Sequence, residues 1–314
     1  MSRPILITGG NGNLGRLVAA RFAANGTRVV RLDLPGSNAA TSSDRERIVF
    51  ADVTDTAQLD AIIAEIKPAA ICHLASLLSS SSEADLARAW EINAGASFTL
   101  MQAAVAHEVR QVFFASTIAS YGPQTAEPMP EDAAQWPENF YGVTKVAVER
   151  MGNYFATRHE LDFRCLRFPM VLSPFAPAGA ATAYPSLAFN AAARGENFTF
   201  PVAPDVGMSS LFLEDVVASI VAIMNADRTR LTRPAYNLHG FYVSAGAVAN
   251  ALTKRYPGFT PTFTSDAAVT ALIKGWPDVQ DDSAARTDWG WEPAFDFAAS
   301  IARMHEIVSA PAID

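Results

Sequence analysis

Cysteine is scarce in this sequence. Only two cysteines occur among 314 residues, Cys72 and Cys165, and both stand inside apolar runs. Such thiols form no disulfide framework, so the sequence predicts a reducing compartment and two cysteines packed as small hydrophobic side chains. The cysteines and the five histidines also show no spacing typical of metal ligands. We therefore expect neither disulfides nor a bound metal ion.

Long apolar stretches and an excess of basic residues are missing as well. No run approaches the roughly 18 apolar residues of a membrane-spanning helix. The start, Met1-Ser2-Arg3-Pro4, lacks the features of a signal peptide. Lys and Arg number 24 against 32 Asp and Glu, which gives a net charge of −8. Because phosphate-rich partners need surplus basic side chains, we expect neither nucleic acid nor a membrane as partner, and a cytoplasmic protein.

The first half of the chain alternates short apolar runs with helical patterns. Continuous apolar runs that end in glycine or polar residues are typical of buried parallel strands. Their alternation with helices predicts an α/β fold built on a Rossmann-type doubly wound parallel sheet. The expected strands are 4–8, 27–32, 48–51, 69–74, 111–115 and 162–168, and the expected helices are 14–25, 57–66, 85–106 and 143–158.

The pattern changes near residue 170. Prolines and alanines follow, then an expected helix over 183–194, short expected strands over 198–200, 210–212 and 235–238, and further helices. This predicts a smaller α+β C-terminal domain, packed closely on the first because no low-complexity linker separates the two. We assign residues 1–170 to the Rossmann domain, with part of the later chain returning to it, and residues 171–314 mainly to a substrate-binding domain.

Three glycines lie between the first expected strand and the first expected helix. Gly9, Gly12 and Gly15 permit a tight turn, let the backbone approach a ligand, and let the helix pack closely on the sheet. A helix N-terminus at this point offers unpaired N–H groups to phosphate. With Asn13 and Leu14, which open the helix, the glycines form an expected pyrophosphate-binding turn for a dinucleotide.

Asp33 ends the second expected strand, at a spacing after the glycines close to that of the carboxylate that binds an adenosine ribose. A carboxylate accepts hydrogen bonds from both ribose hydroxyls and repels a 2′-phosphate. The sequence therefore favours NAD over NADP. Arg31 is a nearby cation that could meet a phosphate, and we expect its side chain to point to the opposite side of the strand.

Tyr141 and Lys145 stand four residues apart at the start of an expected helix, which places them on one face. An ammonium beside a phenol lowers the phenol's pKa from its usual value of about 10. The phenol can then exchange a proton with a substrate oxygen while hydride moves to or from a nicotinamide. Ser116 and Thr117 end the fifth expected strand, and either hydroxyl could hold that oxygen.

These residues together resemble the extended short-chain dehydrogenase/reductase superfamily, of the NAD-dependent epimerase/dehydratase type. The resemblance implies that Thr117 is the catalytic hydroxyl, that Tyr141 is the acid/base, and that Lys145 tunes Tyr141 and holds the nicotinamide ribose. It also implies further cofactor contacts: Asp52 and Val53 beside the adenine, Leu74, Ala75 and Ser76 under the cofactor, Asn93 supporting the sheet and a proton relay, Ser116 next to Thr117, and Phe168 and Met170 at the nicotinamide.

Within that superfamily the chain is similar, nearly end to end, to the short-chain type of L-threonine 3-dehydrogenase. The similarity is carried by residues 73–79, 141–147, 235–238 and 281–291. It implies oxidation of the hydroxyl of a small substrate, such as threonine, to a ketone with NAD, and a homodimer. For the substrate we expect contacts from Ser79, Ser80, Thr117, Thr182 and Trp276.

The chain departs from that pattern in two places. Ala181 and Ala183 stand where the family has a threonine and an aspartate, and Met170 stands where it has a glycine. Because a buried substrate ammonium needs a counter-charge, a related hydroxy acid or a less polar hydroxy compound stays open beside threonine.

Two other functions use the same features. Nucleotide-sugar 4-epimerases share the Tyr/Lys pair, yet their C-terminal half must bind a pyrophosphate, whereas residues 171–193 contain no Lys or Arg. A redox-sensing binding protein would keep the cofactor turn without the chemistry. The presence of Thr117, Tyr141 and Lys145 together favours the dehydrogenase.

Overall fold

The computed structural model describes residues 3–37, 40–41, 43–123, 126–176 and 182–310. Its largest element is a sheet of seven parallel strands in the order β10-β6-β5-β4-β1-β2-β3. The strands after β1 are added on one side of it and those from β4 onward on the other side. The boundary between β1 and β4 is therefore a topological switch point, where such sheets bind ligands. This is the expected Rossmann-type sheet. Its strands are β1 (Ile5–Thr8), β2 (Val29–Asp33), β3 (Glu46–Phe50), β4 (Ala70–His73), β5 (Gln111–Thr117), β6 (Asp162–Phe168) and β10 (Ala235–Asn237).

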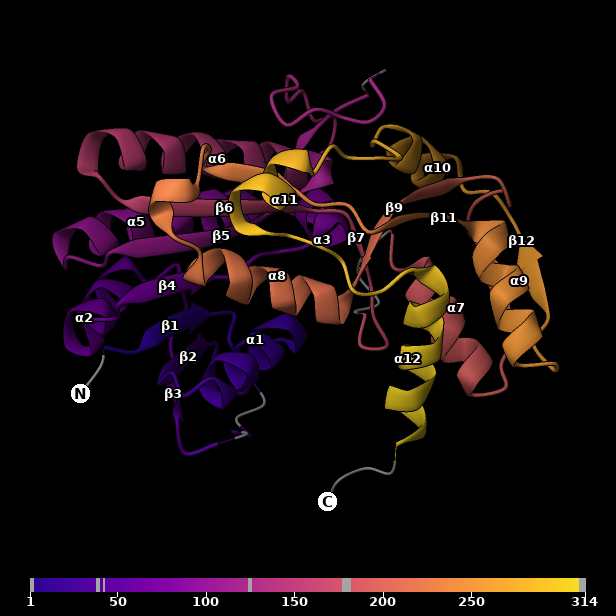
Figure 1. The fold of residues 1–314 in the computed structure, drawn as a ribbon, viewed down its shortest axis with the longest axis horizontal. Helices are drawn as coiled ribbons and strands as arrows, with labels where there is room; N and C mark the ends of the chain where they lie inside the picture. Colours follow the sequence, from indigo (N-terminus) through magenta and orange to yellow (C-terminus); the bar gives the residue numbers. More distant parts are fainter. Residues whose placement is uncertain (1–2, 38–39, 42, 124–125, 177–181, 311–314) are drawn as a thin grey trace.

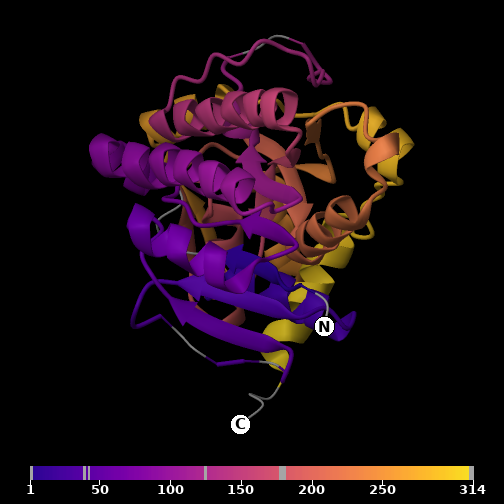
Figure 2. The ribbon, with the colours of Figure 1, turned by 90° about the vertical axis from the view of Figure 1, so that its left-hand side faces the viewer.

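Helices cover both faces of this sheet (Figures 1 and 2). The helices α2 (Thr56–Ile66), α5 (Ala96–Ala106) and α6 (Phe140–His159) pack on one face, and α1 (Asn13–Ala24), α8 (Leu213–Asn225) and α11 (Ser283–Trp289) pack on the other. Between the sheet and each layer of helices lies a hydrophobic cluster, the first under α2, α5 and α6 and the second under α1, α8 and α11. Because side chains alternate along a strand, successive strand residues enter different clusters. Cys165 lies in the first cluster and Cys72 in the second, and both are free thiols.

The expected helix over 85–106 is interrupted in the structure. It consists of α4 (Leu86–Ala89), a π-helical turn η1 (Trp90–Gly95) and α5, and it follows the short helix α3 (Ser79–Ala84). A π-turn adds a residue and rotates the following side chains, and such turns are frequent at functional sites. Here the turn carries the buried Asn93.

The C-terminal part forms two smaller sheets and its own hydrophobic core, which includes Phe189, Phe200 and Met304. One sheet has the order β11-β9-β7 and the other pairs β12 with β8. The later chain also returns to the large sheet through α8, β10 and α11 (Figure 1). Among the described residues, no helix is both long and apolar enough to span a membrane. The remaining elements are β7 (Met170–Leu172), β8 (Phe198–Phe200), β9 (Gly207–Phe212), β11 (Phe241–Ser244), β12 (Pro261–Phe263), α7 (Tyr184–Ala193), α9 (Ala245–Arg255), α10 (Ala267–Lys274), α12 (Phe297–Ser309) and the 3₁₀ turns η2 (Ile118–Ser120) and η3 (Arg228–Arg230).

Candidate active site

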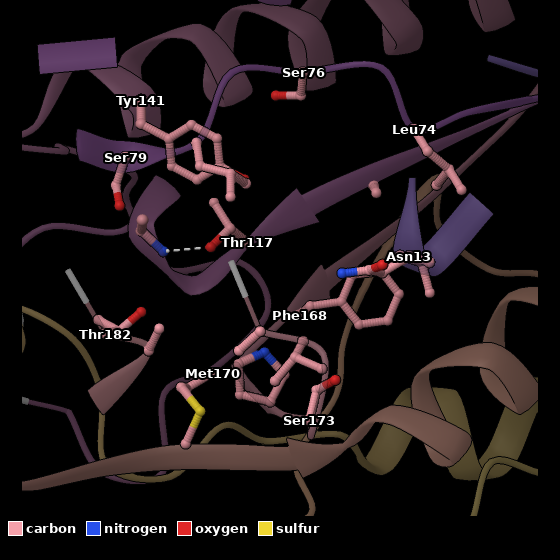
Figure 3. A pocket seen from close by; sticks show the side chains of 18 of the residues that line it. Asn13, Leu74, Ser76, Ser79, Thr117, Tyr141, Phe168, Met170, Ser173 and Thr182 are labelled. Carbon is pink, nitrogen blue, oxygen red and sulfur yellow. Dashed lines mark hydrogen bonds between the residues drawn. The ribbon is translucent and has the colours of Figure 1, made fainter. Parts of the chain in front are cut away.

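A cavity of about 580 Å³ opens at the carboxyl end of the large sheet, where β1, β4, β5 and β6 meet the C-terminal part. Figure 3 shows it from close by. Most of the expected site residues line it: Gly9, Gly12, Asn13, Leu14, Gly15, Leu74, Ser76, Ser79, Ser116, Thr117, Tyr141, Lys145, Phe168, Met170, Thr182 and Trp276. The cavity therefore joins the phosphate-binding turn to the proposed proton-transfer residues.

The glycine turn fits a pyrophosphate. Gly9 has a φ of +66°, and a Cβ there would lie 2.8 Å from the backbone nitrogen of Ala75. A Cβ on Gly15 would lie 2.2 Å from the carbonyl oxygen of Gly9, so only glycine lets α1 begin this close to the turn. The structure shows no side-chain hydrogen bond capping the N-terminus of α1 at Gly12. Its first N–H groups are thus available to the phosphates of a dinucleotide.

Asp33 lies at the adenosine end, outside the cavity itself. Its carboxylate accepts hydrogen bonds from the backbone nitrogens of Asn11 (2.8 Å) and Leu34 (2.8 Å), which fix it beside the glycine turn. A carboxylate oxygen can accept more than one hydrogen bond, so Asp33 can still receive those of a ribose.

The expectation for Arg31 was wrong. Residues two apart in a strand share a face, and Arg31 packs under the glycine turn, where a Cβ on Gly10 would lie 2.6 Å from its own Cβ. Its guanidinium is buried, lies 3.3 Å from the carboxylate of Glu46 and donates to the carbonyl of Ala40. Arg31 therefore lies on the same face of the strand as Asp33, and Glu46 and Ala40 engage its guanidinium.

Tyr141 and Lys145 lie in the first two turns of α6, which Asn139 caps by accepting a hydrogen bond from the backbone nitrogen of Gly142 (2.7 Å). The ammonium of Lys145 donates to the carbonyl of Ala115 (2.9 Å) and lies 5.2 Å from the centre of the Tyr141 ring. Burial lowers the pKa of Lys145 to about 8. The pair thus shares one buried corner of the cavity.

The pKa of Tyr141 differs from the expectation. In the chain alone, burial raises the pKa of this phenol above its usual value. The ammonium of Lys145 lies over the ring face and is engaged by a carbonyl, so it does not offset the loss of solvation.

The two hydroxyls at the end of β5 have different surroundings. Thr117 caps η2 by accepting a hydrogen bond from the backbone nitrogen of Ala119 (3.2 Å), and its side chain faces the cavity below Tyr141 (Figure 3). Its own proton remains available for a ligand oxygen. Ser116 also lines the cavity, but its hydroxyl donates to the buried carboxylate of Glu149.

Asn93 supports the wall of the cavity and is not part of it. Its side-chain oxygen accepts from the backbone nitrogen of Leu77 (2.8 Å) and from the hydroxyl of Ser76 (3.1 Å). Its nitrogen donates to the hydroxyl of Thr144 (3.2 Å) on α6. The π-turn thereby joins the segment after β4 to the helix that carries Tyr141.

The structure places several expected contacts outside the cavity. The carboxylate of Asp52 accepts from Thr54 and pairs with Arg88 (3.1 Å), and Val53 packs in the core. Ser80 is exposed, because consecutive residues of a helix point in different directions and Ser79 faces the cavity. Ala75 meets the glycine turn through its backbone, and Ala181 lies outside the described residues.

Sequence reasoning missed much of the apolar wall. Most of these residues follow strands or open helices, where no periodic signal exists: Leu78, Ile118, Ala119, Pro169, Phe175, Ala176 and Leu213. Sequence reasoning also missed Ala115 and Val171, which lie within β5 and β7, and the polar Ser173. Phe175 also contacts the N-terminus of α1, because the side chain of Asn13 donates to the carbonyl of Phe175 (2.5 Å). Among the described residues, no three His, Cys, Asp or Glu side chains gather closely enough to hold a metal ion.

A buried ion pair lies behind the cavity. Arg167, next to Phe168 on β6, pairs with Glu149, one helical turn after Lys145, at 2.7 Å, and both side chains are almost fully buried. Glu149 also accepts from Ser116 and from Gln135 (3.1 Å), and Arg167 donates to Tyr121 (2.8 Å). The network ties together the ends of β5 and β6 and the helix α6.

Known proteins are similar to this chain over most of its length, including the region that carries the cavity. Residues 5–238 match the NAD dependent epimerase/dehydratase family. The chain is 32% identical over 304 residues to an uncharacterized epimerase/dehydratase of Staphylococcus saprophyticus, covering 95% of this chain and 94% of that protein. It is 30% identical over 306 residues to the mitochondrial L-threonine 3-dehydrogenase of Sus scrofa, covering 96% and 81%.

A solved structure agrees as well. The holo form of a GalE-like L-threonine dehydrogenase from Cupriavidus necator superposes with a TM-score of 0.90 at 28% identity, covering 97% of this chain and 99% of that one. The matched region contains the glycine turn and the Tyr141/Lys145 pair of the cavity. The chain therefore belongs to the NAD dependent epimerase/dehydratase family and is an NAD-dependent oxidoreductase.

Proposed function

We propose that this protein is a dehydrogenase that oxidises the secondary alcohol of a small hydroxy substrate, a β-hydroxy amino acid such as threonine or a related hydroxy compound, with NAD. The observation that carries the proposal is the single cavity that holds Thr117, Tyr141 and Lys145 together with the uncapped N-terminus of α1. The threonine dehydrogenase relatives support the reaction type.

Each residue has a defined task in this proposal. Thr117 donates its free proton to the substrate oxygen and holds it beside Tyr141. Tyr141 accepts the proton of the alcohol, or returns it to the ketone in the reverse direction. Lys145 provides a fixed positive charge under the phenol and binds the ribose next to it. Bound NAD supplies the hydride acceptor and a positively charged ring.

A test separates this activity from a nucleotide-sugar epimerase. NADH absorbance is followed with hydroxy acids, β-hydroxy amino acids, simple alcohols and UDP-sugars. A dehydrogenase accumulates many equivalents of NADH per enzyme, whereas an epimerase retains its reduced cofactor and accumulates none. We expect accumulation with a small alcohol, because residues 171–193 provide no basic side chain for a pyrophosphate. Conversion of a UDP-sugar without NADH release would contradict the proposal.

Replacing Asp33 with asparagine is expected to weaken NAD binding by about tenfold or more and to narrow the preference for NAD over NADP. The variant keeps the size of the side chain but loses the charge that accepts ribose hydrogen bonds and repels a 2′-phosphate. Dissociation constants for both dinucleotides measure the effect. Asp44→Asn, which removes an exposed carboxylate from the same region, is the matched control. An unchanged ratio of the two constants in Asp33→Asn would contradict the assignment.

The protein is also proposed to be a homodimer. Trp90, Phe98 and Tyr154 are 43–56% exposed on the neighbouring elements η1, α5 and α6. An apolar aromatic surface of this kind marks an interaction site. Tyr154→Glu is expected to shift the mass measured by light scattering from twice the chain mass to the chain mass. Tyr242→Glu, which alters an exposed tyrosine on β11, is expected to leave it unchanged. A monomeric wild-type protein would contradict this proposal.

A further inference from the structure

The cavity has very little charge. Among the described residues that line it, Lys145 alone carries a charged side chain, and the lining includes no Asp, Glu, Arg or His. A substrate that carries its own charges would therefore find few partners.

In the proposed function Lys145 binds the nicotinamide ribose and not the substrate. Its ammonium donates to the carbonyl of Ala115 and lies 4.6 Å from the centre of the Phe114 ring and 5.2 Å from that of Tyr141. In the helix α7, which begins at the cavity, Pro185 removes one of the N–H groups that the first turn could offer to an anion. No side chain of the described lining is thus assigned to compensate an ammonium or a carboxylate of a substrate.

The walls near Tyr141 suit a neutral molecule. Figure 3 shows Ser79, Thr182 and Met170 on the same side of the cavity as Tyr141, away from Asn13 and Leu74. Ser79 and Thr182 offer uncharged hydroxyls for hydrogen bonding. Other apolar residues that line the cavity are Leu78, Ile118, Val171 and Trp276.

We infer that the substrate is an uncharged secondary alcohol with apolar substituents, or its ketone, and not an amino acid or a carboxylic acid. The reason is that a charge moved from water into this cavity loses its hydration without gaining a side chain as counter-charge. The inference rests on the proposed dehydrogenase function, and it narrows the substrate class.

The test compares compounds that share the CH₃–CH(OH) group and differ in charge. They are L-threonine, 3-hydroxybutanoate, methyl 3-hydroxybutanoate and 2-pentanol. We expect kcat/KM, measured by NADH formation, to be at least about tenfold higher for the two neutral compounds than for either charged one. A higher kcat/KM for L-threonine or for 3-hydroxybutanoate would overturn the inference and leave the dehydrogenase function intact.

A matched pair of variants tests the missing counter-charge. Ala183 is buried, lines the cavity and precedes α7 at its N-cap position, where aspartate and asparagine are both favoured residues. Ala183→Asp is expected to raise the ratio of kcat/KM for L-threonine over methyl 3-hydroxybutanoate by at least about tenfold. Ala183→Asn, equal in size and uncharged, is expected to leave that ratio unchanged. An equal change in both variants would overturn the inference.

A binding measurement without turnover tests the substrate class separately from the dehydrogenase function. Calorimetric titration of the four compounds into the Tyr141→Phe variant saturated with NAD reports affinity alone. Tighter binding of the neutral compounds supports the inference even if the wild-type protein forms no NADH, in which case the dehydrogenase function fails. Tighter binding of a charged compound, or no binding of either neutral one, overturns the inference.

Discussion

Replacing Tyr141 with phenylalanine is expected to lower kcat for alcohol oxidation by about 10²- to 10⁴-fold. The variant removes only the hydroxyl that accepts the alcohol proton, while the ring continues to pack over Lys145. The dissociation constant for NAD is expected to stay nearly unchanged, because the glycine turn and Asp33 are untouched. Steady-state kinetics and a fluorescence titration with NADH measure the two quantities.

The pH dependence of kcat/KM is a second test of the Tyr141→Phe variant. A base must lose its proton before it can accept one, so kcat/KM for oxidation rises with pH through the pKa of that base. Since burial raises the pKa of Tyr141, we expect the rise to extend into alkaline pH in the wild-type protein and to be absent in Tyr141→Phe. A variant that keeps both turnover and the same rise would show that another group is the base.

Replacing Arg167 with methionine is expected to destabilise the protein by about 3–5 kcal/mol. The change leaves the buried carboxylate of Glu149 with hydrogen bonds from Ser116 and Gln135 but without its counter-charge. Urea denaturation measures the free energy of unfolding. Arg194→Met is the control, because it breaks an ion pair whose side chains are more than half exposed. We expect it to change the free energy of unfolding very little.

A double variant tests the physical reason. In Glu149→Gln/Arg167→Met neither member of this buried pair is charged, so we expect the double variant to recover much of the stability that Arg167→Met loses. If Arg167→Met alone unfolds no more easily than the wild-type protein, the pair does not hold the ends of β5 and β6 as described.

Local sequence patterns were enough to predict where the glycine turn and Asp33 lie in the fold. A buried strand, a glycine turn and a helix follow one another within a short stretch of chain, and Asp33 ends the next strand. The topology of parallel sheets then brings Thr117 to the same edge. The contact between Tyr141 and Lys145 follows from helical spacing alone.

Other features depend on long-range packing. The partner of Arg167 is Glu149, and no local pattern connects a strand residue with a side chain on the preceding helix. The π-turn around Asn93 closes its hydrogen bonds one residue later than an α-helix does, and its sequence contains no proline. The apolar wall comes from segments after several different strands, which only the folded chain brings together.

The central claim is that the hydroxyls of Tyr141 and Thr117 meet the same substrate oxygen beside bound NAD. A crystal structure of the ternary complex with NAD and an unreactive neutral alcohol or ketone analogue tests it most directly. We predict that both hydroxyls lie within hydrogen-bond distance, about 3 Å, of the analogue's oxygen. An analogue oxygen held by other groups, with the Tyr141 hydroxyl turned away from the dinucleotide, would contradict the account.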